Sequence, residues 1–176
     1  MQTADARYPI GKFRLEGDIT PERRREWIAQ IAAVPARFRT AVADLTGEQL
    51  DTPYRDGGWT VRQLVHHLAD SHMNAYVRVK LALTEDNPTI KTYEEALWAA
   101  LPDSASTPPE VSLALLEALH VRWVEVMRAM DDAQWRRTLN HPDRGPMTLE
   151  QLLALYAWHG DHHVAHVTSL RERMGW

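Results

Sequence analysis

Histidines are concentrated in two short segments of this chain, and imidazole is the side chain that most often binds metal ions near neutral pH. His66, His67 and His72 form the first cluster, and four more histidines lie within the eight residues 159–166. Residues four apart on a helix share a face, so a helix over the second cluster would present paired imidazoles to one ion. We therefore expect the rest of the chain to bring the two clusters together.

The second cluster contains an inward-facing pair. If the apolar residues of its helix face the core, then at about 100° per residue His163 and His159 lie nearest to the apolar face. His166 lies near the edge of that face and His162 lies beyond it. The spacing predicts His159 and His163 as metal ligands, and it predicts His162 and His166 as groups that support the ligands or lie at the surface or an interface.

The first cluster leaves two candidates for a third ligand. The apolar centre of its helix passes close to His72, which favours that residue. A polar stripe that includes Ser71, Asn74 and Arg78 favours His67 instead, because a site needs such an edge beside a cavity. Spacing alone does not choose between His67 and His72. The two remaining histidines, His120 and His141, are predicted to be ordinary residues, with His141 in a loop.

Three neutral imidazoles would leave a divalent ion with its full charge and an open coordination position. Such an ion lowers the pKa of bound water from ~15.7 to ~7 and polarises carbonyl or phosphoryl oxygens. Imidazole suits zinc, nickel, copper and iron alike. No Glu follows a ligand in a His-Glu-x-x-His pattern, and the helical phases of Asp70 and Asp161 point away from the core, so no general base is predicted. Possible polar neighbours of the ion are Ser71, Asn74 and Tyr156.

Four long amphipathic segments that are predicted to be helices position these residues. They span about 20–45, 60–84, 107–131 and 148–173, and Pro35 is expected to kink the first of them. Shorter helical turns are predicted at 47–50 and within 93–101. Residues 1–19 are predicted to be an extended N-terminal arm, and the long connection 85–107 is typical of a lid or a binding loop. No segment alternates with period two for long enough to require a sheet.

The fold class is therefore all-α: a four-helix bundle, with a long crossover between the second and third helices, forming a single domain over residues 1–176. The two halves of the chain also resemble each other. Thr60 and Gln63 open the second helix with a capping-box pattern, and Thr148 and Gln151 repeat that pattern at the fourth helix. This repetition favours two related helix pairs.

Composition excludes several classes of function. A net charge of −4 with interspersed basic residues gives no support for binding nucleic acid or an anionic membrane. The chain has no cysteine, which rules out disulfides, thiolate metal ligands and a cysteine nucleophile. There is no signal-peptide pattern and no apolar run near the ~20 residues that span a bilayer. We expect a cytoplasmic protein.

Four blocks of sequence resemble the YfiT branch of the DinB-like four-helix-bundle superfamily. They are Tyr8-Pro9-Ile10-Gly11, residues 51–63, residues 66–74 and residues 158–166. The resemblance implies a bacterial metal-dependent hydrolase that acts on a small-molecule substrate and forms a homodimer. It also implies one zinc ion per chain, or a nickel ion, held by one histidine of the second helix and two of the last. Carried over by position, the ligands are His67, His159 and His163, which chooses His67 over His72.

Three hypotheses follow for the function. In the first, the ion at His67, His159 and His163 activates water against a small substrate that is covered by the 85–107 connection. In the second, the ion holds the thiolate of a low-molecular-weight cosubstrate, as in the bacillithiol S-transferases among the relatives. In the third, the bundle binds a metal ion without catalysis.

Overall fold

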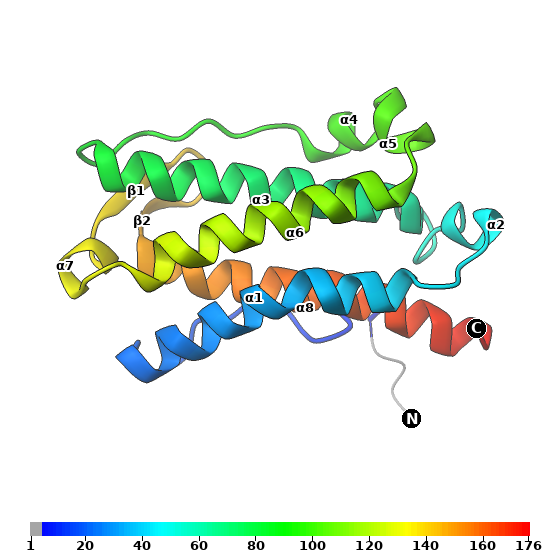
Figure 1. Ribbon diagram of the computed structural model, residues 1–176, viewed down its shortest axis with the longest axis horizontal. Helices are drawn as coiled ribbons and strands as arrows, with labels where there is room; N and C mark the ends of the chain where they lie inside the picture. The colour runs from blue at the N-terminus through cyan, green and yellow to red at the C-terminus, as the bar shows by residue number, and fades with distance from the viewer. Residues whose placement is uncertain (1–4) are drawn as a thin grey trace.

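Four long helices form the body of the protein in the computed structural model, which describes residues 5–176 (Figure 1). The first four residues of the predicted arm, 1–4, lie outside the described residues. The long helices are α1 (Pro21–Val42), α3 (Val61–Thr84), α6 (Pro109–Arg128) and α8 (Leu149–Met174). The short elements between them are α2 (Gly47–Leu50), α4 (Glu95–Ala99), α5 (Pro102–Ser106), α7 (Asp132–Trp135), β1 (Thr138–His141) and β2 (Gly145–Thr148). The predicted four-helix bundle is confirmed.

The order of the helices explains the long crossover. Helix α1 packs against α8 and α6, and α3 packs against α6 and α8. Helices α3 and α6 run in the same direction along the bundle, and so do α1 and α8 (Figure 1). Because parallel neighbours cannot be joined by a tight turn, residues 85–108 must return along the whole length of α3 before α6 can begin. They do so as an extended stretch followed by α4 and α5.

Capping boxes set the starts of the two helices that carry the histidine clusters. The hydroxyl of Thr60 accepts a hydrogen bond from the backbone N–H of Gln63, whose side chain accepts one from the Thr60 N–H. Thr148 and Gln151 do the same for α8. The helices α2 and α7 also begin with capping boxes, so the element order of the first half recurs in the second. The predicted similarity of the two halves is therefore visible in their local structure.

A small hairpin departs from the prediction that no sheet is needed. Strands β1 and β2 pair antiparallel, with Thr138 opposite Thr148 and His141 opposite Gly145. The crossover joins them, because the Ile90 N–H donates to Asn140 O and the Asn140 N–H donates to Pro88 O. Each strand has four residues, too few for period-two alternation to stand out from a loop. The expected loop position of His141 is thus wrong, because this residue ends β1.

The apolar core is divided into two clusters along the bundle axis. One contains Ile31, Tyr76, Trp123 and Leu152, and the other contains Phe38, Leu68, Leu116 and Val167, together with further buried residues in each. The positions between them on α3, α6 and α8 include His72, His120 and His159. His72 and His120 are 0% and 2% exposed. A layer of histidines therefore crosses the middle of an otherwise apolar bundle.

Gly160 allows α8 to approach α1 beside this layer. A Cβ atom at this position would overlap a methyl group of Val34, which is completely buried. We expect Gly160→Val to lower the free energy of unfolding by about 2–3 kcal/mol through overpacking, as measured by urea denaturation. Gly47→Val is the matched control because no atom lies within 4 Å of the added group, and it should change the free energy by less than about 0.5 kcal/mol. Equal effects of the two substitutions would contradict this interpretation of the α1–α8 contact.

No helix within residues 5–176 combines the length and the apolar character that a membrane crossing requires.

Candidate metal centre

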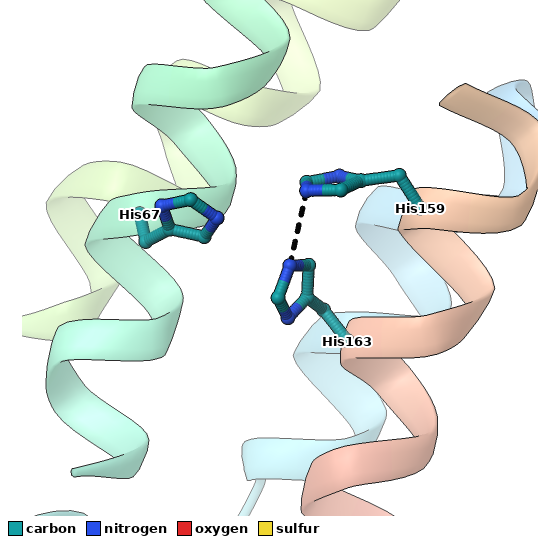
Figure 2. Close-up of side chains that lie close together, drawn as sticks. All are labelled: His67, His159 and His163. Carbon is teal, nitrogen blue, oxygen red and sulfur yellow. Dashed lines mark hydrogen bonds between the residues drawn. The ribbon is translucent and has the colours of Figure 1, made fainter. Parts of the chain in front are cut away.

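Three histidines from two helices meet between α3 and α8. One nitrogen each from His67, His159 and His163 lies within 4.8 Å of the others. Figure 2 shows the ring of His67 projecting from α3 toward the two rings that α8 contributes. His67 is 4% exposed and His163 is 7% exposed, and His159 is partly buried. These are the three residues that the resemblance selected.

The spacing of the two α8 rings fits a common metal ion. The Nε2 atoms of His159 and His163 are 3.0 Å apart. In a tetrahedral zinc site with Zn–N bonds of ~2.0–2.1 Å, two ligand nitrogens lie about 3.3 Å apart. An ion could therefore be bound with only a small movement of either ring. The i, i+4 spacing on one helix produces this approach.

Burial keeps the three imidazoles neutral. It lowers the pKa of His67 to about 4. It also lowers the pKa values of His159 and His163 well below the usual value, and the charge that a neighbouring imidazole would carry lowers them further. A metal ligand must be deprotonated at the coordinating nitrogen, so these rings offer lone pairs at neutral pH without first losing a proton.

A second group of histidines shares one member with the first. His162, His163 and His166 also place one nitrogen each within 4.8 Å of one another. His162 and His166 are 7% and 3% exposed, so the surface location considered for them is wrong. Helical phase could not show this, because the cover comes from outside α8: the ring of Tyr54 stacks on His166 at 4.1 Å, and the carbonyl of Arg7 lies 3.3 Å from His166 Nε2.

The two groups differ in the elements that supply them. The first draws on α3 and α8, whereas α8 alone supplies the second. Ring packing does not separate them, because His162 is stacked against Trp158 at 4.3 Å between centroids and His67 lies against Trp59 at 4.6 Å. His166 Nε2 already faces the carbonyl of Arg7, which leaves one nitrogen of that ring for other partners.

His72, the residue that helical phase favoured, belongs to neither group in the described part of the chain. Its Nε2 atom lies 3.2 Å from Nδ1 of His159, behind the ring that faces the site. Its Nδ1 atom lies 2.8 Å from Nε2 of His120. His72 was thus correctly predicted to be buried, but the structure places it behind a ligand candidate.

The histidine groups open into a pocket of about 450 Å³. Its walls come from α3, α8, the loop after α2, the N-terminal segment, and single residues of α4 and the β1–β2 turn. Three of the lining side chains are arginines, and one is a carboxylate. The lining residues are Arg7, Tyr8, Tyr54, Arg55, Gly57, Gly58, Trp59, His67, Glu95, Arg144, Trp158, His159, His162, His163 and His166.

Ser71, Asn74 and Tyr156 were predicted as polar neighbours of the ion, whereas Asp70 and Asp161 were expected to point away from the core. Asp161 pairs with Arg37 on the outside of the bundle, and the amide of Asn74 donates to the carbonyl of Asp70. The hydroxyl of Tyr156 accepts a hydrogen bond from Arg78 at 3.3 Å, and its ring centroid is 5.5 Å from that of His159. Ser71 is 4% exposed. None of these side chains, nor that of Asp70, is among the described residues that line the pocket.

Sequence reasoning missed Glu95, the one carboxylate among the described lining residues. It lies in α4, within the 85–107 connection that was expected to cover the site, and it is the only residue of that connection that reaches the pocket wall in the described structure. The length of the connection was the available signal. It could not single out Glu95, because the position of α4 depends on its packing against α3.

Comparison with known proteins identifies the family. The family model of the DinB superfamily matches residues 30–167. The solved structure of YfiT from Bacillus subtilis superposes with a TM-score of 0.94 at 52% sequence identity, and the match covers 97% of this chain and 98% of that one. This chain belongs to the YfiT-like branch of the DinB superfamily. The resemblance drawn from the four sequence blocks is confirmed.

Two further YfiT-like relatives come from Bacillus mycoides strain KBAB4 and Bacillus cereus strain AH820. Each is 55% identical over 172 residues, and the match covers 98% of this chain and 99% of the relative. Both carry the inferred function of a metal-dependent hydrolase, and the YfiT structure is described by a similar inference, with an unusual four-helix-bundle topology. The parallel α3–α6 pair and its long crossover give this YfiT-like chain the same bundle.

Proposed function

We propose that this protein is a metal-dependent hydrolase whose ion is bound by His67, His159 and His163, with one zinc ion per chain and nickel as the alternative. One observation carries the proposal: three neutral imidazoles from two helices, two of them buried and one partly buried, converge within 4.8 Å at the wall of a pocket. Three histidines leave a fourth coordination position open, as in zinc hydrolases and hydratases. The name shared by the relatives supports the same activity.

The residues around the triad of His67, His159 and His163 have separable roles. A divalent ion in this place supplies a Lewis acid that polarises a substrate oxygen and lowers the pKa of water. Trp59, whose ring centroid is 4.6 Å from that of His67, and Trp158 form apolar parts of the pocket wall that limit access of bulk water. Glu95, the one carboxylate among the described lining residues, is our candidate for the group that accepts the proton that water loses during hydrolysis.

The pocket favours a substrate with an anionic group. Arg55 and Arg144 line it, and neither forms an ion pair with a carboxylate within residues 5–176, although the charge of Arg144 reaches Glu95 on the same wall. The Nε atom of Arg55 is buried without a hydrogen-bond acceptor in the described structure. Guanidinium groups bind carboxylates and phosphates through paired hydrogen bonds. We infer that a small ester or amide bearing a carboxylate or phosphate is preferred over its neutral analogue.

We expect Glu95→Gln to lower kcat for hydrolysis about 100-fold, the lower end of what a positioned general base contributes, with little change in KM. The amide cannot accept the proton from water but keeps the shape of the side chain. Glu94→Gln is the matched control, because Glu94 is the neighbouring carboxylate, exposed like Glu95, that does not line the pocket. Equal losses in the two variants would remove Glu95 from the mechanism.

The proposed function is tested by loading untagged protein with zinc or nickel and measuring hydrolysis of paired esters and amides that differ only in one carboxylate. Metal-dependent turnover that is faster for the acidic member of each pair supports the proposal. A parallel assay with cysteine and a haloarene separates hydrolysis from thiol transfer. Turnover only when the thiol is present would replace the hydrolase by the transferase, and a bound ion without either activity would leave a metal-binding bundle.

A further inference from the structure

A row of ring-to-ring contacts runs from His159 across the bundle to helix α1. His159 Nδ1 lies 3.2 Å from His72 Nε2, and His72 Nδ1 lies 2.8 Å from His120 Nε2. His120 Nδ1 then lies 2.7 Å from the carbonyl oxygen of Ile31. The rings of His72 and His120 are only 9° from parallel, with centroids 5.0 Å apart. Because their nitrogens are much closer than their centroids, these two rings meet edge to edge, as an in-plane N–H···N bond requires.

The carbonyl at the end of this row fixes the direction of every hydrogen bond in it. A carbonyl oxygen only accepts, and a neutral imidazole has one N–H and one lone pair. Nδ1 of His120 must therefore carry the proton, which leaves its Nε2 as an acceptor for the Nδ1–H of His72. By the same step, His72 Nε2 accepts from the Nδ1–H of His159. The remaining nitrogen of His159, Nε2, is then an unprotonated lone pair at the triad.

Proline explains why this carbonyl is available. In an α-helix the carbonyl of residue 31 accepts a hydrogen bond from the backbone N–H of residue 35. Residue 35 is Pro, which has no N–H, so the carbonyl of Ile31 has no helical partner. Ile31 and Pro35 are both buried, and an unpaired buried carbonyl is costly. The imidazole of His120 supplies the missing donor. Pro35, which was expected only to kink α1, thus leaves a free acceptor at the centre of the bundle.

We propose that the Ile31 carbonyl, His120 and His72 form a positioning relay that holds His159 in the Nδ1–H tautomer, so that its Nε2 lone pair faces the triad. The proposal rests on the proposed metal site and adds three groups that act on it through His159. Hydrogen-bond partners behind a ligand histidine orient the ring and strengthen its binding of metal. Here the partners are two further histidines in series.

The other α8 ligand is held by a similar but shorter row. His163 Nδ1 lies 3.4 Å from His166 Nδ1, and His166 Nε2 lies 3.3 Å from the carbonyl of Arg7. The same reasoning puts a lone pair on Nε2 of His163. With both rows in place, neither Nε2 atom can donate across the 3.0 Å contact that the dashed line marks in Figure 2. Two lone pairs that face each other at this distance repel, and a cation between them removes the repulsion.

The first test reads the tautomers directly in the metal-free wild-type protein. Long-range ¹H–¹⁵N NMR distinguishes a protonated ring nitrogen from an unprotonated one for each histidine. We expect Nδ1 to be protonated, and Nε2 to be bare, in His120, His72 and His159. Detection of the Nε2–H tautomer at His159 or at His120 would overturn the relay. This measurement needs no variant and no catalytic activity.

The second test measures the effect of the relay on zinc affinity by competition with a chelator. We expect His72→Leu to weaken zinc binding about 10–100-fold, the usual effect of removing a partner behind a ligand. His72→Gln should keep an affinity close to that of wild type, because its amide oxygen can accept from His159 while its NH₂ donates to His120. A packing role alone would not be restored by Gln, because Leu fills the apolar surroundings at least as well.

His66→Gln is the matched control. His66 is also buried on the same helix, but its nitrogens contact Ser112 and the carbonyl of Thr107 instead of the relay. This control should bind zinc as wild type does. Wild-type affinity in a folded His72→Leu variant would overturn the proposal, and if that variant does not fold, the NMR result decides.

The two proposals can fail separately. Tight zinc binding at the triad together with an Nε2–H tautomer at His159 would reject the relay and keep the metal site. The predicted tautomers without zinc binding would reject the metal site and, with it, the positioning role toward an ion.

Discussion

The substitution His67→Ala is expected to abolish stoichiometric metal binding and, with it, hydrolysis, whereas His162→Ala should retain both. His67 is the only ligand candidate that α3 contributes, and it lies within 4.8 Å of the two α8 ligands. Without it, two imidazoles from one helix remain, too few for the three protein ligands of a catalytic zinc site. His162 belongs only to the alternative group with His163 and His166.

The measurement is metal content per chain, by elemental analysis of untagged protein after soaking in zinc or nickel and desalting. We expect about one ion in wild type and in His162→Ala, and none in His67→Ala. His163→Ala is the positive control for loss, because His163 is common to both groups. Loss of the ion in His162→Ala with retention in His67→Ala would move the site to the second group.

Acidification of the metal-free protein from pH 6.5 to pH 4 is expected to lower its free energy of unfolding by several kcal/mol. Burial lowers the pKa of all nine histidines, so in this range the unfolded chain binds more protons than the folded one. Stability must then fall as the pH falls. The loss begins near the unfolded pKa of ~6.5 and is complete below the folded values.

Two residues suffice to show the size of this effect. The pKa values of His67 and His120 are each lowered to about 4, so each should contribute a loss of about 3 kcal/mol when the window is fully crossed. Asp70 and Glu95 act in the opposite direction, since burial raises the pKa of Asp70 to about 6 and also raises that of Glu95, but these two groups oppose nine histidines. The total stability of a domain is about 5–15 kcal/mol, so we expect the metal-free protein to unfold within this window.

Urea denaturation at intervals between pH 7.5 and pH 4.5, with a chelator present, measures this loss. The variant His120→Gln should show a smaller dependence on pH, because one of the buried bases is gone. Saturation with zinc should move the acid transition to lower pH, since the ion competes with protons for the ligand nitrogens. A free energy of unfolding that stays constant from pH 7 to pH 5 would mean that the histidines are more accessible to water than the structure indicates.

The local sequence was sufficient for the long helices and for one pair of candidate ligands. Capping residues such as Thr60 and Thr148 act on backbone groups within three residues, and helical periodicity needs only a stretch of one helix. His159 and His163 are four apart on the same helix, so their convergence is also a local property. The hairpin of β1 and β2 escaped because its four-residue strands depend on pairing with each other and with the crossover.

The third candidate ligand could not be derived from spacing, because α3 is buried on several sides. Helices α6 and α8 and the segments α4 and α5 all pack against it, and both His67 and His72 are enclosed. Periodicity finds the direction in which a helix is most apolar. It does not say which buried direction faces a particular neighbour. The resemblance to known proteins selected His67 over His72. The fold gives the reason, because His67 meets the two α8 histidines whereas His72 lies behind His159.

By itself the sequence therefore determined the absence of cysteine, which composition alone shows. It also determined the four helices, their caps and the inward pair His159 and His163, because each of these depends on neighbours along the chain. Only the tertiary structure decided the positions of His67, Glu95 and the pocket arginines, and only it brought Ile31, His120 and His72 into line behind His159. These groups come from helices or loops distant in sequence. Their proximity results from the parallel packing of α3 with α6 and from the close approach of α8 to α1, which no local pattern encodes.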